Sequence, residues 1–131
     1  MALRFKHSLN IIQAVCYFNA ERILKYIKEL FRDDSDAKRD LVNYQEPHGG
    51  NLAIHFAVLK GNKRAIDILL ECFGANPLAL TANGLCVLHC AAQFERGVLS
   101  IEYFSHERFG INFNYQDRFK CTPLHFAVLN M

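Results

Sequence analysis

The feature that most constrains this chain is a pair of short sequence motifs that occurs twice in the same order. Asn43-Tyr44-Gln45-Glu46 precedes His55-Phe56-Ala57-Val58-Leu59, and Asn114-Tyr115-Gln116-Asp117 precedes His125-Phe126-Ala127-Val128-Leu129. A third copy of the second word, Leu88-His89-Cys90-Ala91-Ala92, lies between them, so the three histidines are 34 and 36 residues apart. A fixed period of this length predicts a stack of similar supersecondary units.

Each unit begins with turn residues, followed by the histidine and an apolar helical pattern, and then by a second helix. Second helices are predicted over residues 20–31, 63–73 and about 98–109. In the middle one, a stripe of apolar residues recurs at helical spacing, namely Ala65, Ile66, Leu69, Leu70 and Phe73. One helix pair of this kind cannot bury both of its faces, so we expect its stability to come from stacking on its neighbours.

The words themselves resemble the ankyrin repeat. Thr122-Pro123-Leu124-His125-Phe126-Ala127 matches that family's T-P-L-H-x-A word, and Gly61-Asn62 matches the pair that closes its first helix. Gly74-Ala75-Asn76 and residues 110–114 match the phrase that follows its second helix. The resemblance is clear from residue 43 onward and weaker over residues 8–31.

The resemblance implies an all-α solenoid of helix–turn–helix units with short hairpin-like loops. We expect one domain over residues 1–131, which consists of a divergent N-terminal capping repeat at about 8–42, repeats at 43–78 and 79–113, and an incomplete repeat at 114–131. The residues expected to hold the repeats together are His55, His89, Thr122, Pro123 and His125.

Elementary chemistry supports these roles. An imidazole can join backbone groups of neighbouring turns, the Thr122 hydroxyl can cap a helix, and Pro123 suits its first position, with Leu124 pointing inward. Leu52-Ala53 and Cys86-Val87 replace Thr-Pro in two copies, which removes a hydroxyl cap at about 1 kcal/mol each.

Lys120 stands where the family prefers glycine in the D-x-x-G turn, and Gly84 and one of Gly49 or Gly50 hold that place in the other copies. A lysine with positive φ at this position would cost about 1 kcal/mol.

In the ankyrin family, partners bind at the loop tips and on the inner face of the first helices. The resemblance therefore implies a protein partner, and the corresponding candidates here are His48, Asn51, Lys60, Asn83, Leu85, Gln93, Phe94, Arg118, Phe119 and Cys121. Phe94 and Phe119 are each equally compatible with two roles, as an exposed anchor of an interface or as a cover for a neighbouring repeat.

Charge and composition argue against several other classes of protein. A formal net charge of +2 and the lack of a basic stretch argue against nucleic-acid binding. Residues 32–40 carry both signs and are interpreted as a solvated loop. Charges interrupt every apolar run, so no direct membrane insertion is expected. Five cysteines in irregular spacing favour reduced thiols and a cytoplasmic location.

No catalytic, cofactor or metal site is predicted, and the chain is not expected to be an enzyme. Cys86, His89 and Cys90 fall within one helical turn, but zinc needs four converging ligands and no second pair lies nearby. The histidines are already explained by the repeat, and no phosphate loop or nucleophile motif occurs.

Two expectations concern what lies beyond these repeats. The sequence stops at Met131 soon after a first helix begins, so we expect further repeats or another chain to complete the C-terminal end. The third and fourth copies also resemble the repeats of ankyrin-bearing DHHC S-acyltransferases. This likeness implies an alternative function, as the N-terminal regulatory or substrate-recruiting fragment of such a membrane enzyme.

Overall fold

The regular elements of the chain are helices. The computed structural model describes residues 9–93, 98–105 and 109–129, and within these residues no strand is present. The helices are α2 (Ile11–Tyr17), α3 (Glu21–Leu30), α4 (Ser35–Asn43), α5 (Ala53–Leu59), α6 (Lys63–Cys72), α7 (Val87–Ala92), α8 (Val98–Phe104) and α9 (Pro123–Leu129). The predicted all-α fold class is confirmed.

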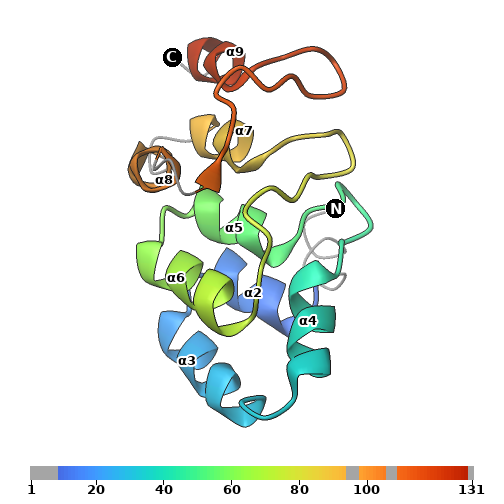
Figure 1. Ribbon diagram of the computed structural model, residues 1–131, viewed down its shortest axis with the longest axis vertical. Coiled ribbons are helices and arrows are strands. Elements are labelled where there is room, and N and C mark those ends of the chain that lie inside the picture. The colour runs from blue at the N-terminus through green and yellow to red at the C-terminus, as the bar shows by residue number, and fades with distance from the viewer. Residues whose placement is uncertain (1–8, 94–97, 106–108, 130–131) are drawn as a thin grey trace.

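The helices stack in two rows, with the loops projecting to one side (Figure 1). In the first row α2 packs on α5, α5 on α7 and α7 on α9, and in the second row α3 packs on α6 and α6 on α8. Every residue of α5 from Ala53 to Val58 is buried, because α2, α6 and α7 surround it. This arrangement is the predicted helical solenoid.

Short polar residues start several of these helices. The side chains of Asn10, Asp34 and Asn62 each accept a hydrogen bond from the backbone amide three residues later, which satisfies a donor that the helix itself leaves unpaired. In α6 the predicted stripe is present, with Ala65, Ile66, Leu69 and the adjoining Phe73 buried and Leu70 partly buried.

The charged segment at residues 32–40 was expected to be a solvated loop, and this expectation is wrong. Residues 35–43 form α4, which lies beside α2 and α5. Two features explain the helix: Asp34 caps it, and Val42 is buried at 1% exposure. In addition, Nδ2 of Asn10 donates to the carbonyl of Leu41 across the interface at 2.8 Å. The charges of α4 occupy its solvent-facing side.

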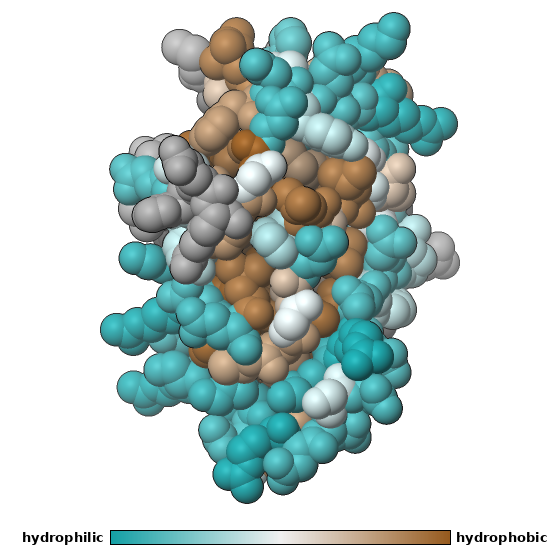
Figure 2. Space-filling view, in the orientation of Figure 1, coloured by the Kyte–Doolittle hydropathy of each residue, from teal (hydrophilic) through white to brown (hydrophobic). Residues whose placement is uncertain are grey.

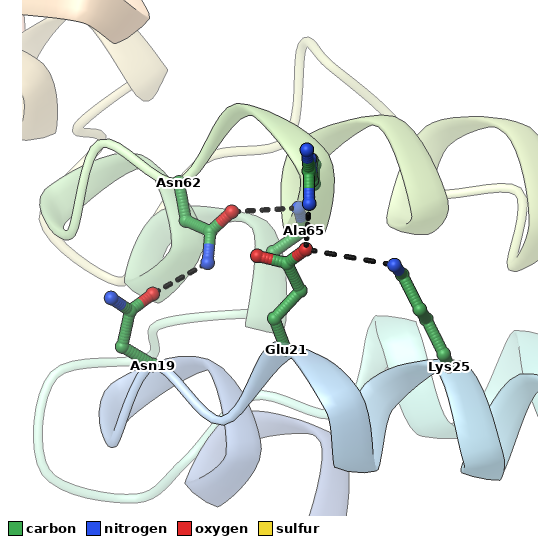
Figure 3. Close-up of polar contacts among 6 residues, drawn as sticks. Asn19, Glu21, Lys25, Asn62 and Ala65 are labelled. Carbon is green, nitrogen blue, oxygen red and sulfur yellow. Dashed lines mark hydrogen bonds and ion pairs between the residues drawn. The ribbon is translucent and has the colours of Figure 1, made fainter.

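The turns between first and second helices join consecutive layers (Figure 3). Nδ2 of Asn62 donates to Oδ1 of Asn19, while Oδ1 of Asn62 caps α6 through the amide of Ala65. Glu21 lies 3.2 Å from Arg64 in the next layer and 3.7 Å from Lys25 one turn along α3. These contacts fix the spacing of the first two layers at the end of the first helices.

Leu124 was expected to point inward, and this expectation is wrong. Leu124 in α9 is 71% exposed, whereas Leu88 at the corresponding place in α7 is 1% exposed. The difference arises because α9 covers α7, while none of the described helices packs on the far side of α9.

The hairpin turn at Lys120 has the predicted backbone. Lys120 has φ of 64°, and Gly50 and Gly84 at the corresponding places have φ of 68° and 76°. A Cβ atom is disfavoured in this region, because it approaches the neighbouring carbonyl oxygen. Lysine at this position therefore keeps the turn at the expense of stability.

Replacing Lys120 with glycine is expected to raise the free energy of unfolding by about 1 kcal/mol, because the strain at positive φ is removed. Urea unfolding followed by circular dichroism at 25 °C measures the change. Lys120→Ala is the matched control, since it removes the charge but keeps the Cβ atom. An equal gain in both variants would assign the effect to charge and contradict the backbone explanation.

Candidate protein-interaction surface

The hairpin loops are positioned by histidines that join one layer to the next. Nδ1 of His55 accepts from the amide of Leu52 at 3.0 Å, and Nε2 donates to the carbonyl of Ala79 at 3.1 Å. Nδ1 of His89 likewise accepts from the amide of Cys86, and Nε2 lies 2.7 Å from the carbonyl of Cys121. An imidazole that accepts at Nδ1 and donates at Nε2 is neutral.

Gln13 makes the same connection in the first layer, where the sequence has no histidine. Its Oε1 accepts from the amide of Asn10, and its Nε2 donates to the carbonyls of Tyr44 and Asn51 at 2.7 and 3.0 Å. An amide side chain can replace imidazole here because it also carries one acceptor and a donor at its far end. Sequence reasoning missed Gln13, although it stands three residues after the capping residue Asn10, as His55 does after Leu52.

A polar side chain shapes each hairpin turn from within. The Glu46 carboxylate accepts from the amides of His48, Gly49 and Asn51, and these hydrogen bonds outweigh the opposing effect of its burial and lower its pKa. Asp117 accepts from two amides of its turn, and the Thr81 hydroxyl accepts from one. The three turns are therefore built in the same way: the first residue of each has a side-chain oxygen that accepts hydrogen bonds from backbone amides of its own turn.

Backbone hydrogen bonds hold the three turns side by side. The amide of Ala82 donates to the carbonyl of Gly49 at 3.1 Å, and the amide of Arg118 donates to the carbonyl of Asn83 at 2.8 Å. The loops accordingly lie along one side of the stack (Figure 1). We call this surface the tip row, and it comprises His48, Asn51, Asn83, Leu85, Arg118, Phe119 and Cys121.

The predicted binding residues divide into two sets. Those of the tip row lie together, with His48, Asn83, Arg118 and Phe119 exposed and Asn51, Leu85 and Cys121 partly exposed. Lys60 and Gln93 instead cap the C-terminal ends of α5 and α7, at the opposite end of the first helices. Phe94 lies outside the described residues.

Two cations near these surfaces stack on aromatic rings. The Arg118 guanidinium lies 5.9 Å from the centre of the Phe119 ring, and Nζ of Lys60 lies 4.9 Å from the centre of the Tyr17 ring. Phe119 remains 67% exposed, so it does not serve as a cover for another described repeat. An exposed aromatic with a cation beside it offers both contact area and charge to a partner.

The side chains that could bind a metal ion do not come together in the described part of the chain. Among the described residues, no group of three or more His, Cys, Asp or Glu side chains is placed to hold a metal ion. All five cysteines are free thiols. In the same part of the chain, each helix is too short or too polar to cross a membrane.

Comparison with known protein families identifies one segment of the chain. Residues 49–82, which run from the end of the first hairpin turn through α5 and α6 to the start of the next turn, match the family model of the ankyrin repeat. No curated protein matches the chain, and the likeness to S-acyltransferase repeats gains no support. The match and the layered helices together support the ankyrin-repeat family for this chain.

Proposed function

We propose that this chain is a protein-interaction module that binds a partner through the tip row and the adjoining inner face of the first helices. The observation that carries the proposal is the tip row itself: three turns of the same design, joined by backbone hydrogen bonds, that present exposed side chains along one side of the helix stack. Because the backbone groups of these turns are hydrogen-bonded within the protein, the exposed side chains are available to contact a partner.

The chemistry of the tip row favours a polypeptide partner of mixed polarity. His48 and Asn83 offer hydrogen-bonding groups, Arg118 offers a positive charge, and Phe119 offers an apolar ring. Interfaces between proteins depend on a few aromatic and arginine residues surrounded by polar contacts, and Arg118 with Phe119 forms such a pair. No observation favours the S-acyltransferase alternative.

Replacing Phe119 with alanine is expected to weaken binding to the partner about tenfold or more, because an exposed aromatic anchor would be lost. The partner is first recovered by affinity capture from the native source and identified by mass spectrometry. Its affinity for the wild-type chain and each variant is then measured by isothermal titration calorimetry.

Tyr26→Ala is the matched control, because Tyr26 in α3 is also a 67% exposed aromatic but lies outside the tip row. Both variants are expected to keep the wild-type unfolding midpoint. If both substitutions weaken binding equally, or if Phe119→Ala leaves the affinity unchanged, the tip row is not the binding surface.

A further inference from the structure

The first layer of the stack, formed by α2 and α3, exposes several large apolar residues. They are Ile11, Phe18, Ile23, Tyr26 and Leu30, and each is more than half exposed. The face of the protein shown in Figure 2 is mostly hydrophilic over α3 and α4, so these residues are not gathered on that face. Monomeric proteins rarely expose a contiguous apolar patch of more than a few hundred Å², and larger patches mark interaction sites.

The apolar residues of α3 lie on the side that faces away from the second layer. Oε1 of Glu21 lies 3.2 Å from the guanidinium of Arg64 in α6, which identifies the side of α3 that faces that layer. Ile23, Tyr26 and Leu30 lie about 140–200° around the helix from Glu21, because successive residues are about 100° apart. They therefore form a stripe on the outer side of α3.

The two apolar residues of α2 lie on the same outer side. The side chain of Gln13 reaches the second layer through the carbonyls of Tyr44 and Asn51. Ile11 and Phe18 are about 140–160° around α2 from Gln13. Since α2 packs on α3, the five residues share one surface. We call it the end face, and it comprises Ile11, Phe18, Ile23, Tyr26 and Leu30.

The second layer shows what such a surface packs against. Ala65 and Cys72 are the third and last residues of α6, as Ile23 and Leu30 are of α3. Ala65 is 2% exposed and Cys72 is partly buried, and α3 packs against α6. Positions that a helix covers in the second layer are thus open in the first, so the end face is suited to contact with another helix.

Two charged residues beside the stripe favour α3 of a second copy as that helix. Arg22 and Glu29 are exposed and border the same edge of the stripe, one residue before Ile23 and Leu30. In an antiparallel pair of α3 helices, one register places Ile23 opposite Tyr26 of the second copy. In this register Arg22 lies opposite Glu29 of the second copy, and two-fold symmetry repeats the contact. The alternative register, with Tyr26 opposite Leu30, would bring the two Glu29 carboxylates together, which is unfavourable.

The contacts that Glu29 makes within its own chain leave it able to form this pair. Lys28 and Arg32 each lie 3.8 Å from its carboxylate, at the surface of the protein. Ion pairs of this kind contribute little to stability, because water screens them and long side chains lose freedom in forming them. A guanidinium from a second copy would approach the same carboxylate at an interface that excludes part of this water.

We propose that two copies of this chain associate through their end faces, with α3 of one copy antiparallel to α3 of the other. The same two-fold axis brings Ile11 opposite Phe18 of the second copy. The midpoints of the Ile11–Phe18 and Ile23–Tyr26 pairs are at similar distances along the chain from the turn that joins α2 to α3. A two-fold contact closes on itself, so it gives a dimer. This inference is independent of partner binding at the tip row.

Sedimentation velocity of the full chain over a range of concentrations measures the association. We expect a dimer with a dissociation constant on the order of 10 µM, at the weak end of the range for specific interfaces. Arg22→Glu and Glu29→Arg are each expected to weaken self-association about tenfold or more, because each places like charges opposite one another. An equimolar mixture of the two variants is expected to regain at least the wild-type affinity, since one carries two negative charges at these positions and the other two positive charges.

Lys63→Glu is the matched control, because it reverses an exposed charge in α6 outside the end face, and it should leave the dimer unchanged. Tyr26→Ala is expected to weaken the dimer about tenfold or more without affecting partner binding, and Phe119→Ala to do the opposite. Urea unfolding at about 1 µM, where most of the protein is monomeric, verifies that each variant keeps the wild-type midpoint.

Three results would overturn the proposal. The first is a wild-type chain that remains monomeric up to about 200 µM, well above the expected dissociation constant. The second is a series of species larger than a dimer that grows with concentration, which would show an open arrangement of copies. The third is a mixture of Arg22→Glu and Glu29→Arg that associates no more strongly than either variant alone.

Discussion

Replacing His55 with alanine is expected to lower the free energy of unfolding by about 4 kcal/mol. His55 is fully buried and joins the amide of Leu52 to the carbonyl of Ala79. The substitution leaves both backbone groups without their partner and opens a cavity in the middle of the first row of helices. Each unsatisfied group costs about 1–3 kcal/mol, and the lost packing adds to this. Urea unfolding at 25 °C and pH 7.5 measures the loss.

His125→Ala is the matched control, because it makes the same change at the corresponding position of the last repeat. His125 is exposed, and water can satisfy the groups that its side chain leaves. We expect a loss of about 1 kcal/mol or less. Equal losses at the two positions would show that the connection between layers is not what makes His55 important.

His55→Gln tests whether hydrogen bonding or volume decides the effect. Gln13 shows that an amide side chain can accept one backbone amide and donate to carbonyls of the next layer in this fold. We therefore expect His55→Gln to recover about half of the stability that His55→Ala loses. Alanine and glutamine variants of equal stability would assign the effect to the shape of the imidazole.

The parts of the fold that follow from local rules could be predicted from the sequence. The repeated words located the first helices, and the stripe in residues 63–73 located α6. The positive φ of Lys120 followed from its alignment with Gly84, because the left-handed region is a property of the turn and not of the residue that occupies it. Each of these features is set by a few residues that are close in the sequence.

The parts that depend on neighbouring layers were missed. α4 carries many charges, and only its contacts with α2 and α5 show which side is buried. The role of Gln13 depends on the carbonyls of Tyr44 and Asn51, which are more than 30 residues away. Leu124 obeys the repeat pattern, yet its exposure is decided by which helix packs on α9. Sequence periodicity predicts a face that is able to be buried, and packing decides whether it is.

The tip row stands between these two cases. The sequence locates its turns through Asp117, Gly84 and their equivalents. It does not predict the backbone hydrogen bonds from Ala82 to Gly49 and from Arg118 to Asn83, which join one turn to the next. Lys60 and Gln93 were grouped with the tips because the family's inner face includes the first helices. Their place at the far ends of α5 and α7 makes them a separate set.

Acidification is expected to destabilise the wild-type chain through His55 well before most carboxylates are protonated. Burial lowers the pKa of His55 from 6.5 to about 4 in the folded state, and the bond to the carbonyl of Ala79 offsets only part of this effect. Above pH 6.5 the imidazole is neutral in both states, so its contribution to stability is complete. As the pH falls from 6.5 to 4, the unfolded chain binds a proton that the folded chain excludes. Stability is lost over this window, by an amount on the order of 3 kcal/mol.

The difference in unfolding free energy between wild type and His55→Gln isolates this effect, because glutamine does not titrate. Urea unfolding is measured at intervals between pH 7.5 and 4.5 for both proteins. The stability advantage of wild type should shrink steadily below pH 6.5, while the contributions of His89 and Glu46 cancel in the difference. A constant difference across this range would mean that the folded state accepts a proton on His55, and that the neutral imidazole is not what holds the two layers together.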